Sequence, residues 1–221
     1  CKMAMSIDGR CGPASGKPLH ITSETARLDV QWLRARVDAI ITGIGTIIAD
    51  NPALTVRLDP NVIPGIRDQR QLMQPWRIVL DSKLQISPRA RIFKEPGQVS
   101  VFYNTADPQQ LAAVCKENIH SCQFPSLNGH VDLQSVLKFL AKQEVNEVLI
   151  EAGPTLAGAA IESGLVDELV IYIAPHLMGD DAMGAFHLPT LDGGHKRTQL
   201  HIKAIDQVGP DLRIKASLLA H

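Results

Sequence analysis

Short runs of Val, Ile and Leu, bounded by turn residues, alternate with longer amphipathic stretches along most of the chain. This alternation favours an α/β fold with a largely parallel sheet, because parallel neighbours are usually joined by a helical crossover. The apolar runs are continuous, which is typical of strands covered on both faces. We predict strands at Met3–Ile7, Ala39–Thr42, Arg77–Asp81, Val99–Asn104, Glu147–Glu151 and Glu168–Ala174. We predict helices at Ser23–Ala35, Pro108–Asn118, Leu133–Gln143 and Thr155–Ser163, with Ser23 as the N-cap of the first.

The last part of the chain has a different pattern. Two runs of alternating residues, Gln199–Asp206 and Leu212–Leu219, are separated by Gly209-Pro210. They predict an antiparallel hairpin added to a sheet edge. Residues 59–75, rich in Pro, Gln and Asp, predict an exposed loop. Nothing in the pattern separates two cores, so we expect one domain over residues 1–221.

Composition and charge argue against several classes of protein. The net charge of −1 comes without a long basic run, which argues against a nucleic-acid surface. No stretch approaches the roughly 20 apolar residues that cross a bilayer, and no signal-peptide pattern is found. The four cysteines lack C-x-x-C or metal-type spacing and predict reduced thiols, so we expect a cytoplasmic location.

The stretch IEAGPTLAG, residues 150–158, combines a strand end, a carboxylate and a helix start made of small residues. In a parallel α/β sheet the ligand crevice lies beyond the carboxyl ends of the strands, where Glu151 is expected. Pro154 suits the first helical position, and the following N–H groups point along the positive end of the helix dipole. Gly153, Ala157 and Gly158 would let a phosphate approach the backbone. A tight turn packed against its neighbours, with Glu151 as a solvated cap, explains the same residues, and both interpretations stay open.

A second unusual stretch, TGIGTIIADNPALTVR, covers residues 42–57. Gly43 and Gly45 follow a predicted strand, but the third glycine position of a dinucleotide fingerprint holds Ile48, and Pro52 stops any long helix. The G-x-G-x-x-G motif therefore fails. A glycine pair over which a cofactor lies and a simple strand-to-turn glycine are the two alternatives.

Two arginines are candidate phosphate ligands. Arg34 and Arg36 end a predicted helix, where cations suit the dipole, and Asp38 lies four residues beyond Arg34. Arg57 follows Thr55-Val56 on a predicted short strand. The residues alone favour the helix-end interpretation of Arg34. The functional alternative is that Arg34 and Arg57 converge on one phosphate, since the guanidinium fork matches phosphate oxygens.

Metal and nucleophile motifs are missing from the sequence. The eight histidines show no H-E-x-x-H and no Cys/His ligand spacing, and there is no G-x-S-x-G elbow. The zinc deaminase signature H-x-E…P-C-x-x-C is also absent. We therefore expect no metal site and a chemistry that depends on an organic cofactor.

Four segments carry a resemblance to a known family. In chain order they are KMAMSIDGR, ITSETARLDVQWLRARVDAIITGIGTIIADNPALTVR, RIVLDS and EAGPTLAGAAIESGLVDELVIYIAPHLMG. Together they closely resemble the reductase domain of the bifunctional riboflavin biosynthesis deaminase–reductase. The resemblance implies a dihydrofolate-reductase-like, three-layer α/β fold with a mostly parallel central sheet and a C-terminal antiparallel hairpin. It also implies NADPH-dependent reduction of 5-amino-6-(5-phosphoribosylamino)uracil to 5-amino-6-(5-phosphoribitylamino)uracil, with hydride delivered to ribose C1′.

The resemblance also assigns residues to the site. Opening the ribosylamine needs an acid and a base, and the ionisable groups at matching positions are Lys2, Asp50 and Glu151. The matching NADPH-binding positions are Ala4, His20, Thr46, Asp50, Ser82, Gly153, Pro154, Thr155, Leu156, Ala157, Gly158 and Ala159. The matching substrate-binding positions are Pro18, Arg34, Leu54, Arg57 and Glu151. With the resemblance, Arg34 and Arg57 are both expected on the ribose phosphate.

The partners expected from the resemblance are a phosphorylated ribosylaminopyrimidine substrate, a deaminase domain in a longer parent chain that begins upstream of Cys1, and a second copy in a homodimer. Neither nucleic acid nor a membrane is expected as a partner. Two other functions fit much of the pattern. One is a reductase whose substrate keeps the 2-amino group, which the motifs do not separate from the first. The other is a non-catalytic nucleotide-binding module, which the retained Lys2, Asp50 and Glu151 disfavour.

Overall fold

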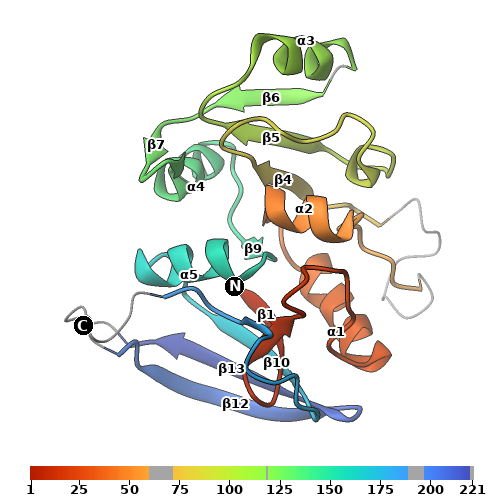
Figure 1. Ribbon diagram of the computed structural model, residues 1–221, viewed down its shortest axis with the longest axis vertical. Coiled ribbons are helices and arrows are strands. Elements are labelled where there is room, and N and C mark those ends of the chain that lie inside the picture. The colour runs from red at the N-terminus through yellow and green to blue at the C-terminus, as the bar shows by residue number, and fades with distance from the viewer. Residues whose placement is uncertain (60–71, 118, 189–196, 220–221) are drawn as a thin grey trace. The chain divides into compact units, whose positions relative to one another are not determined.

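The computed structural model describes residues 1–59, 72–117, 119–188 and 197–219 (Figure 1). The chain divides into two compact units: unit 1 comprises Cys1–Asp29 and Ile150–His221, and unit 2 comprises Val30–Leu149. Unit 1 is therefore discontinuous in sequence. The expectation of a single domain over residues 1–221 stays a prediction. Most of the predicted loop at 59–75 lies outside the described residues.

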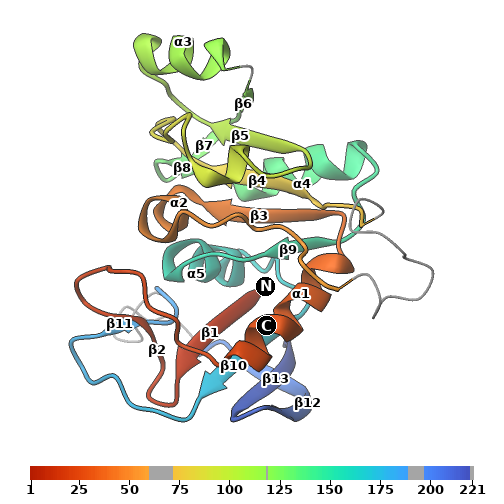
Figure 2. The same cartoon turned by 90° about the vertical axis from the view of Figure 1, so that its right-hand side faces the viewer.

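Unit 2 is built on a five-stranded sheet with the order β6-β5-β4-β3-β9, which runs from top to bottom in Figure 2. The pairs β3–β4, β4–β5 and β5–β6 are all parallel. The α/β class with a mostly parallel sheet is therefore confirmed. The strands are β3 (Ala39–Gly43), β4 (Trp76–Leu80), β5 (Val99–Tyr103), β6 (His120–Gln123) and β9 (Val148–Ile150), with a separate pair β7 (Ser126–Leu127) and β8 (His130–Val131).

Both faces of this sheet are covered by other side chains. Successive residues of a strand point to opposite faces, so two neighbours on one strand show what covers each face. On β5, Val101 belongs to an apolar cluster that includes Ile47 and Val114. Its neighbour Phe102 packs instead against Phe124 and Phe139, with ring centroids 4.5 and 5.6 Å away. The continuous apolar runs in the sequence are thus explained by strands covered on both sides. The helices that follow α1 in this unit are α2 (Ile44–Asp50), η3 (Arg91–Phe93), α3 (Pro108–Lys116) and α4 (Leu133–Lys142).

Residues 44–59 differ from the sequence-based expectation. A seven-residue helix, α2, follows β3 directly and ends at Asn51, whose φ of 41° is left-handed. Pro52 comes next, so it limits the helix to two turns without preventing it. The short strand predicted around Thr55-Val56 is wrong, because residues 51–59 form neither helix nor strand. Seven residues are too few to show a helical period.

The helix α1 (Glu24–Ala35) begins as predicted, since the Ser23 hydroxyl accepts a hydrogen bond from the Ala26 N–H at 3.2 Å. The same hydroxyl donates to the buried Asp211 carboxylate at 2.6 Å. Asp211 starts the last strand of unit 1, so this N-cap also anchors the start of the helix to the C-terminal hairpin.

Unit 1 contains a four-stranded sheet with the order β1-β10-β13-β12. The β1–β10 pair is parallel, and β13 runs antiparallel to both β10 and β12. The predicted hairpin is confirmed, with Gly209 in its turn at a φ of 62°. Besides the first part of α1, unit 1 contains β1 (Lys2–Ser6), β2 (Arg10–Gly12), α5 (Pro154–Glu162), β10 (Leu169–Ala174), β11 (Met183–Gly184), β12 (Leu200–Val208) and β13 (Asp211–Leu218).

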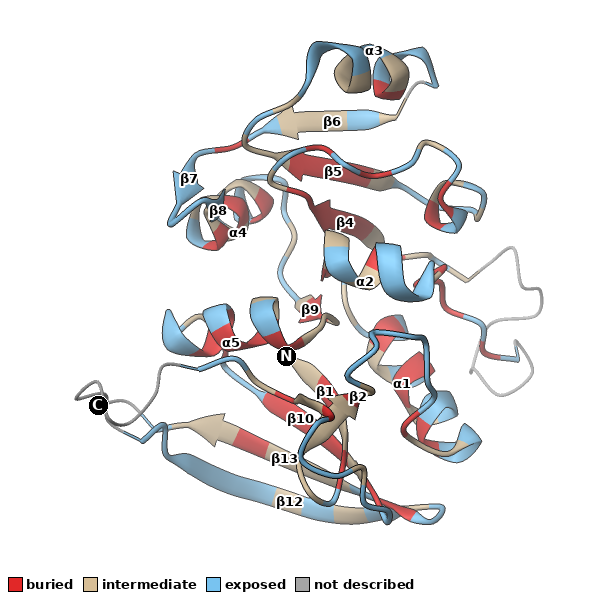
Figure 3. Cartoon of the chain, in the orientation of Figure 1, coloured by how far each residue is buried: buried red, intermediate tan, exposed pale blue. Residues whose placement is uncertain are grey.

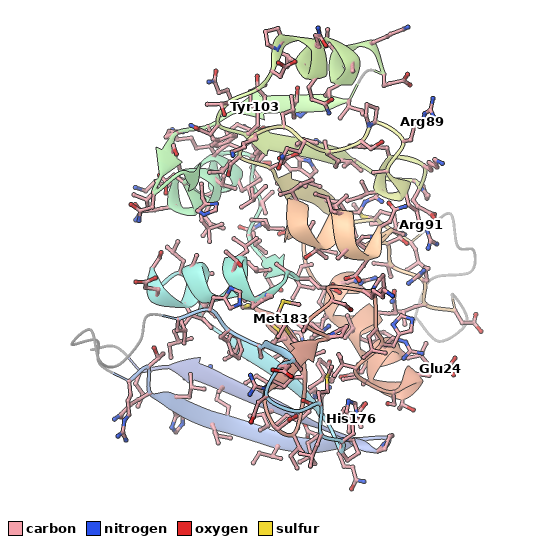
Figure 4. All side chains as sticks on the ribbon, in the orientation of Figure 1. Glu24, Arg89, Arg91, Tyr103, His176 and Met183 are labelled. Atoms are coloured by element: carbon pink, nitrogen blue, oxygen red, sulfur yellow. The ribbon has the colours of Figure 1, made fainter. Side chains whose placement is uncertain are left out.

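The strand β12 is the edge of this sheet and is exposed along most of its length (Figure 3). Ile202 and Ile205 are 53% and 59% exposed. A smaller two-stranded sheet pairs β2 with β11, which carries Met183 (labelled in Figure 4), and a Cβ added at Gly12 would lie 3.1 Å from the Met183 methyl carbon. None of the helices within the described residues has the length and apolar character that a bilayer crossing requires.

Candidate functional site

In unit 1, two of the predicted catalytic residues are neighbours. Lys2, the first residue of β1, forms an isolated parallel bridge with Glu151, which directly follows β9. Both residues are half-buried. The start of β1 thus carries an ammonium group, and the position after the end of β9, which pairs with it, carries a carboxylate. This combination is able to give and take protons.

The aromatic ring next to Lys2 is fixed by a partly buried network. Lys2 Nζ lies 6.0 Å from the centroid of the Tyr172 ring, within the range of a cation–π contact. The Tyr172 hydroxyl donates to Asp29 at 2.6 Å, and Arg213 donates to the same carboxylate oxygen at 2.6 Å. Burial, followed by the bond to Asp29, raises the pKa of Tyr172 far above its ordinary value. The hydroxyl therefore stays protonated, and the ring offers Lys2 a neutral surface.

The turn before α5 has the backbone geometry of an anion site. Gly153 is the N-cap, with extended φ and ψ of −73° and 179°, and as a glycine it has no side chain of its own to cap the helix. Pro154 occupies the first turn and is buried, whereas Thr155 is exposed. The first-turn N–H groups of a helix are suited to phosphate oxygens. The residues present therefore fit the pyrophosphate of a dinucleotide.

Gly158 has a packing role that the sequence did not reveal. A Cβ at this position would lie 2.1 Å from the carbonyl oxygen of His187. His187 crosses the start of α5: its N–H donates to the Pro154 carbonyl at 3.1 Å, and its Nδ1 lies 3.1 Å from Thr155 Oγ1. Ala157 is fully buried. The small residues of α5 therefore make room for a crossing segment, and phosphate contact at Gly158 and Ala157 stays a prediction.

We expect Gly158→Ala to lower the free energy of unfolding by about 1–3 kcal/mol, because a backbone carbonyl must move to admit the methyl group. Urea denaturation measures the change. The matched control is Gly45→Ala on α2, where an added Cβ meets nothing within 4 Å. A Gly158→Ala variant as stable as the control would contradict the packing role.

In unit 2, the residues expected to bind the cofactor lie on α2 and in the turn after β4. Thr46 is half-buried and Asp50 is exposed, both on α2. The Ser82 hydroxyl accepts a hydrogen bond from the Val131 N–H at 3.1 Å, which leaves its own O–H able to donate. Lys83 is exposed. The turn thus offers a hydroxyl donor next to an exposed cation.

Asp81, which could repel a phosphate near Ser82, is turned away into the interior. It is fully buried, and its Oδ2 accepts a hydrogen bond from the Ile86 N–H at 2.7 Å. The Leu84 N–H also donates to the Asp81 carbonyl, at 3.0 Å. Asp81 therefore closes the turn from the interior side. The groups left for a ligand on the outer side are the Ser82 hydroxyl and the Lys83 ammonium group.

The substrate-binding candidates of unit 2 lie in the irregular segment after α2. Leu54 is 3% exposed and has a φ of 54°, whereas Arg57 is exposed. Arg34 is only 7% exposed, and its Nη1 donates to the Thr55 carbonyl at 3.1 Å. Arg34 therefore holds the segment that carries Arg57. Direct contact of both arginines with one phosphate stays a prediction.

The remaining candidates belong to unit 1. Ala4 is half-buried in β1, opposite Tyr172 of β10. Pro18 and His20 are exposed in the segment between β2 and α1. Glu151 also counts among the substrate-binding candidates, and its backbone pairs with that of Lys2. Any role of these residues in binding stays a prediction.

Sequence reasoning missed Arg77, which is fully buried in β4. Its guanidinium donates to five backbone carbonyls, those of Ala53, Ile92, Glu95, Pro96 and Gly97. Burial lowers the pKa of Arg77, although the nearby Glu95 opposes this. The available signal was a single arginine within an otherwise apolar run, since Lys and Arg are rarely fully buried unless paired.

A cavity of about 300 Å³ beside α2 contains none of the expected site residues in its lining. It lies between α2 and the segment from Gln85 to Ala90.

Within the residues that the structure describes, no group of three or more His, Cys, Asp or Glu side chains could hold a metal ion. Independently of this, the ammonium group of Lys2 and the carboxylate of Glu151 are side chains able to transfer protons.

Known proteins similar to this chain include a protein family and individual riboflavin biosynthesis enzymes. The RibD C-terminal domain family matches residues 1–214. Riboflavin biosynthesis protein RibD of Escherichia coli K12 is 43% identical over 214 residues, which are 96% of this chain and 57% of that protein. A 5-amino-6-(5-phosphoribosylamino)uracil reductase of Buchnera aphidicola subsp. Acyrthosiphon pisum is 34% identical over 90% of this chain and 96% of its own length.

Among solved structures, RibD of Acinetobacter baumannii matches with a TM-score of 0.82 and 33% identity, over 99% of this chain and 57% of that one. This match confirms the fold class expected from the four sequence segments. The chain spans little more than half the length of the two RibD proteins, and nearly all of the Buchnera reductase.

Proposed function

Because this chain belongs to the RibD C-terminal domain family, we propose that it reduces 5-amino-6-(5-phosphoribosylamino)uracil to 5-amino-6-(5-phosphoribitylamino)uracil with NADPH. The observation that carries the proposal is the match to a relative named for this reaction, over 90% of this chain and 96% of that relative. The neighbouring Lys2 and Glu151 support it, since the reaction needs proton transfer. In riboflavin biosynthesis this would be the reductase step.

The chemistry divides into ring opening and reduction. Opening the ribosylamine places a proton on the ring oxygen and removes one from the exocyclic nitrogen, which leaves an imine at C1′. We assign these transfers to Lys2 and Glu151, without separate roles for each, and a part for Asp50 stays a prediction from the family resemblance. Bound NADPH supplies the hydride that C1′ accepts, and the nitrogen then regains a proton. The carboxylate of Glu151 and the ammonium of Lys2 can carry opposite halves of this exchange.

Binding is proposed to rest on two kinds of phosphate contact. The start of α5, with its backbone N–H groups, suits the pyrophosphate of NADPH. The exposed Arg57 suits the ribose phosphate of the substrate, because a guanidinium binds two phosphate oxygens at once. These assignments give the pyrophosphate a helix start and the substrate phosphate a cation.

The direct experiment is to follow NADPH oxidation by the purified chain with the phosphoribosylaminouracil, against a reaction without substrate. A parallel arm uses the pyrimidine that keeps its 2-amino group. Substrate-dependent oxidation that is faster with the uracil supports the proposal. A preference for the aminated substrate supports the alternative reductase, and no substrate-dependent oxidation with either overturns both.

We predict that NADPH is preferred over NADH. A 2′-phosphate needs donors and positive charge, which Ser82 and Lys83 offer, while Asp81 is turned inward. The Ser82→Ala, Lys83→Ala double variant is expected to lose about 10- to 150-fold in kcat/KM for NADPH, the value of a charged hydrogen bond of about 1.5–3 kcal/mol. Its kcat/KM for NADH should change little.

The control for this prediction is Lys138→Ala, which removes an exposed lysine from α4 of the same unit. It should leave the preference intact. Equal use of NADH and NADPH by the unmodified protein would refute the assignment of Ser82 and Lys83.

We also propose that two copies associate through the β12 edge. Exposed Ile202 and Ile205 support this, since β12 pairs on only one side within the described residues and edge strands pair readily with other chains. Sedimentation of the purified chain measures the mass, and a monomer at micromolar concentration would contradict it. A deaminase domain in the parent protein and a cytoplasmic location are proposals that rest on the family alone.

A further inference from the structure

The segment 53–57 is buried without belonging to a helix or strand. Ala53, Leu54 and Thr55 are each 3% exposed and Val56 is 1% exposed, whereas Arg57 is exposed. Buried backbone N–H and C=O groups need hydrogen-bond partners, which regular secondary structure normally supplies. Since this segment is irregular, its partners must come from elsewhere.

Two buried arginines supply partners for its carbonyl groups. Arg77 Nη1 on β4 donates to the Ala53 carbonyl at 2.9 Å. Arg34 Nη1 on α1 donates to the Thr55 carbonyl at 3.1 Å. The two guanidinium groups therefore fix the first half of the segment from two different elements.

Two glutamines fix the second half. Gln74 Oε1 accepts from the Val56 N–H at 2.8 Å, while Gln74 Nε2 donates to the Val56 carbonyl at 3.1 Å. One side chain thus satisfies both backbone groups of a residue, as a neighbouring strand would do. Gln31, buried on α1, accepts from the Arg57 N–H at 2.9 Å through its Oε1. The backbone at Arg57 is therefore fixed at the point where its side chain leaves the interior.

The conformation of Leu54 shows how firmly the segment is held. Its φ of 54° is uncommon for a bulky residue and costs free energy. Such a conformation persists only where the surroundings determine it, and here the hydrogen bonds to Ala53 and Thr55 lie on either side. The segment is consequently preorganised before any ligand arrives.

We propose that Gln31, Gln74 and Arg77 are positioning residues that hold segment 53–57, here named the phosphate arm, so that Arg57 meets the substrate phosphate with its backbone already ordered. Preorganisation strengthens binding because the ordering cost is met during folding. The phosphate as ligand rests on the proposed function. The three positioning residues act through Arg57 and are assigned no contact with substrate.

The test uses the two glutamines, because removing Arg77 would leave five carbonyl groups unpaired and risk unfolding. Gln31→Met and Gln74→Met keep the length of the side chain and remove its hydrogen bonds. The matched control is Gln110→Met, since Gln110 Nε2 donates to the Ile86 carbonyl at 2.7 Å, outside the phosphate arm. Each change is also made in an Arg57→Ala background.

We expect Gln31→Met and Gln74→Met to raise the KM for the phosphorylated substrate about three- to tenfold for each hydrogen bond lost. The kcat and the KM for NADPH should stay within about twofold of wild type, as should the substrate KM of Gln110→Met. In the Arg57→Ala background the glutamine changes should add almost nothing, because residues that act through one group are not additive. Hydrogen exchange of the backbone amides of Val56 and Arg57 should accelerate in Gln31→Met and Gln74→Met but not in Gln110→Met.

An unchanged substrate KM together with faster exchange at Val56 and Arg57 would overturn the proposal, as would equal KM increases with and without Arg57. A fall in kcat and melting temperature matched by Gln110→Met would reduce the contacts to general stability and also overturn it. Binding of ribose 5-phosphate, measured by calorimetry, separates this proposal from the reaction. If wild type binds it through Arg57 and the glutamines but reduces no substrate, the phosphate arm stands and the proposed function fails.

Discussion

Replacing Glu151 by Gln is expected to lower kcat by about 100- to 10,000-fold, the usual contribution of a positioned acid or base. Gln keeps the shape of the side chain but can neither hold nor release the proton. Glu151 stands next to Lys2 at the end of a parallel strand and is only half-buried, so the substitution removes a charge that water still reaches. We therefore expect the fold to tolerate it.

The measurement is kcat for NADPH oxidation with the phosphoribosylaminouracil, together with a urea denaturation curve for each protein. Glu162→Gln, at the exposed end of α5, is the matched control. It should keep wild-type turnover. A Glu151→Gln enzyme with near-wild-type kcat would remove Glu151 from the proton transfers, whereas loss of folding cooperativity would contradict the expected tolerance.

Replacing Arg57 by Ala is expected to raise the KM for the phosphorylated substrate about 10- to 150-fold, which corresponds to losing a charged hydrogen bond of about 1.5–3 kcal/mol. The kcat should change little, because a phosphate distant from C1′ is bound equally in the ground and transition states. The variant should also lose the preference for phosphorylated over dephosphorylated substrate. That loss of preference is the informative result.

Arg36→Ala is the control for Arg57, since Arg36 is exposed just after α1. Arg34→Ala should also weaken substrate binding, but with a lower free energy of unfolding, because Arg34 is buried and donates to the Thr55 carbonyl. If Arg57→Ala impairs binding of the dephosphorylated substrate as strongly as that of the phosphorylated one, Arg57 does not recognise the phosphate.

Local pattern determined most of the regular structure. The runs around Val79 and Val101 predicted buried parallel strands, since both faces of such strands are covered. Ser23 predicted a helix start because its hydroxyl caps a neighbouring N–H. Gly209-Pro210 predicted the turn of the C-terminal hairpin, which requires a positive φ. Each of these features depends on residues close together in the sequence.

The phosphate arm and the packing of α5 were decided by tertiary structure. The strand predicted at Thr55-Val56 was wrong because the buried backbone there bonds to side chains of Gln31, Arg34, Gln74 and Arg77 rather than to another strand. These partners lie on elements far apart in the chain, so no local period records them.

The sequence left two interpretations of IEAGPTLAG open, a phosphate-binding helix start and a tightly packed turn, because the neighbours of these residues lie far away in the chain. The sequence alone determined that a carboxylate, a turn and a bare helix start follow a buried strand. Only the tertiary structure showed that His187 crosses the helix at Gly158, and that Lys2 of β1 stands beside Glu151. Periodicity and turn chemistry are local properties, whereas the neighbour of a small residue or a carboxylate is set by chain segments that meet only after folding.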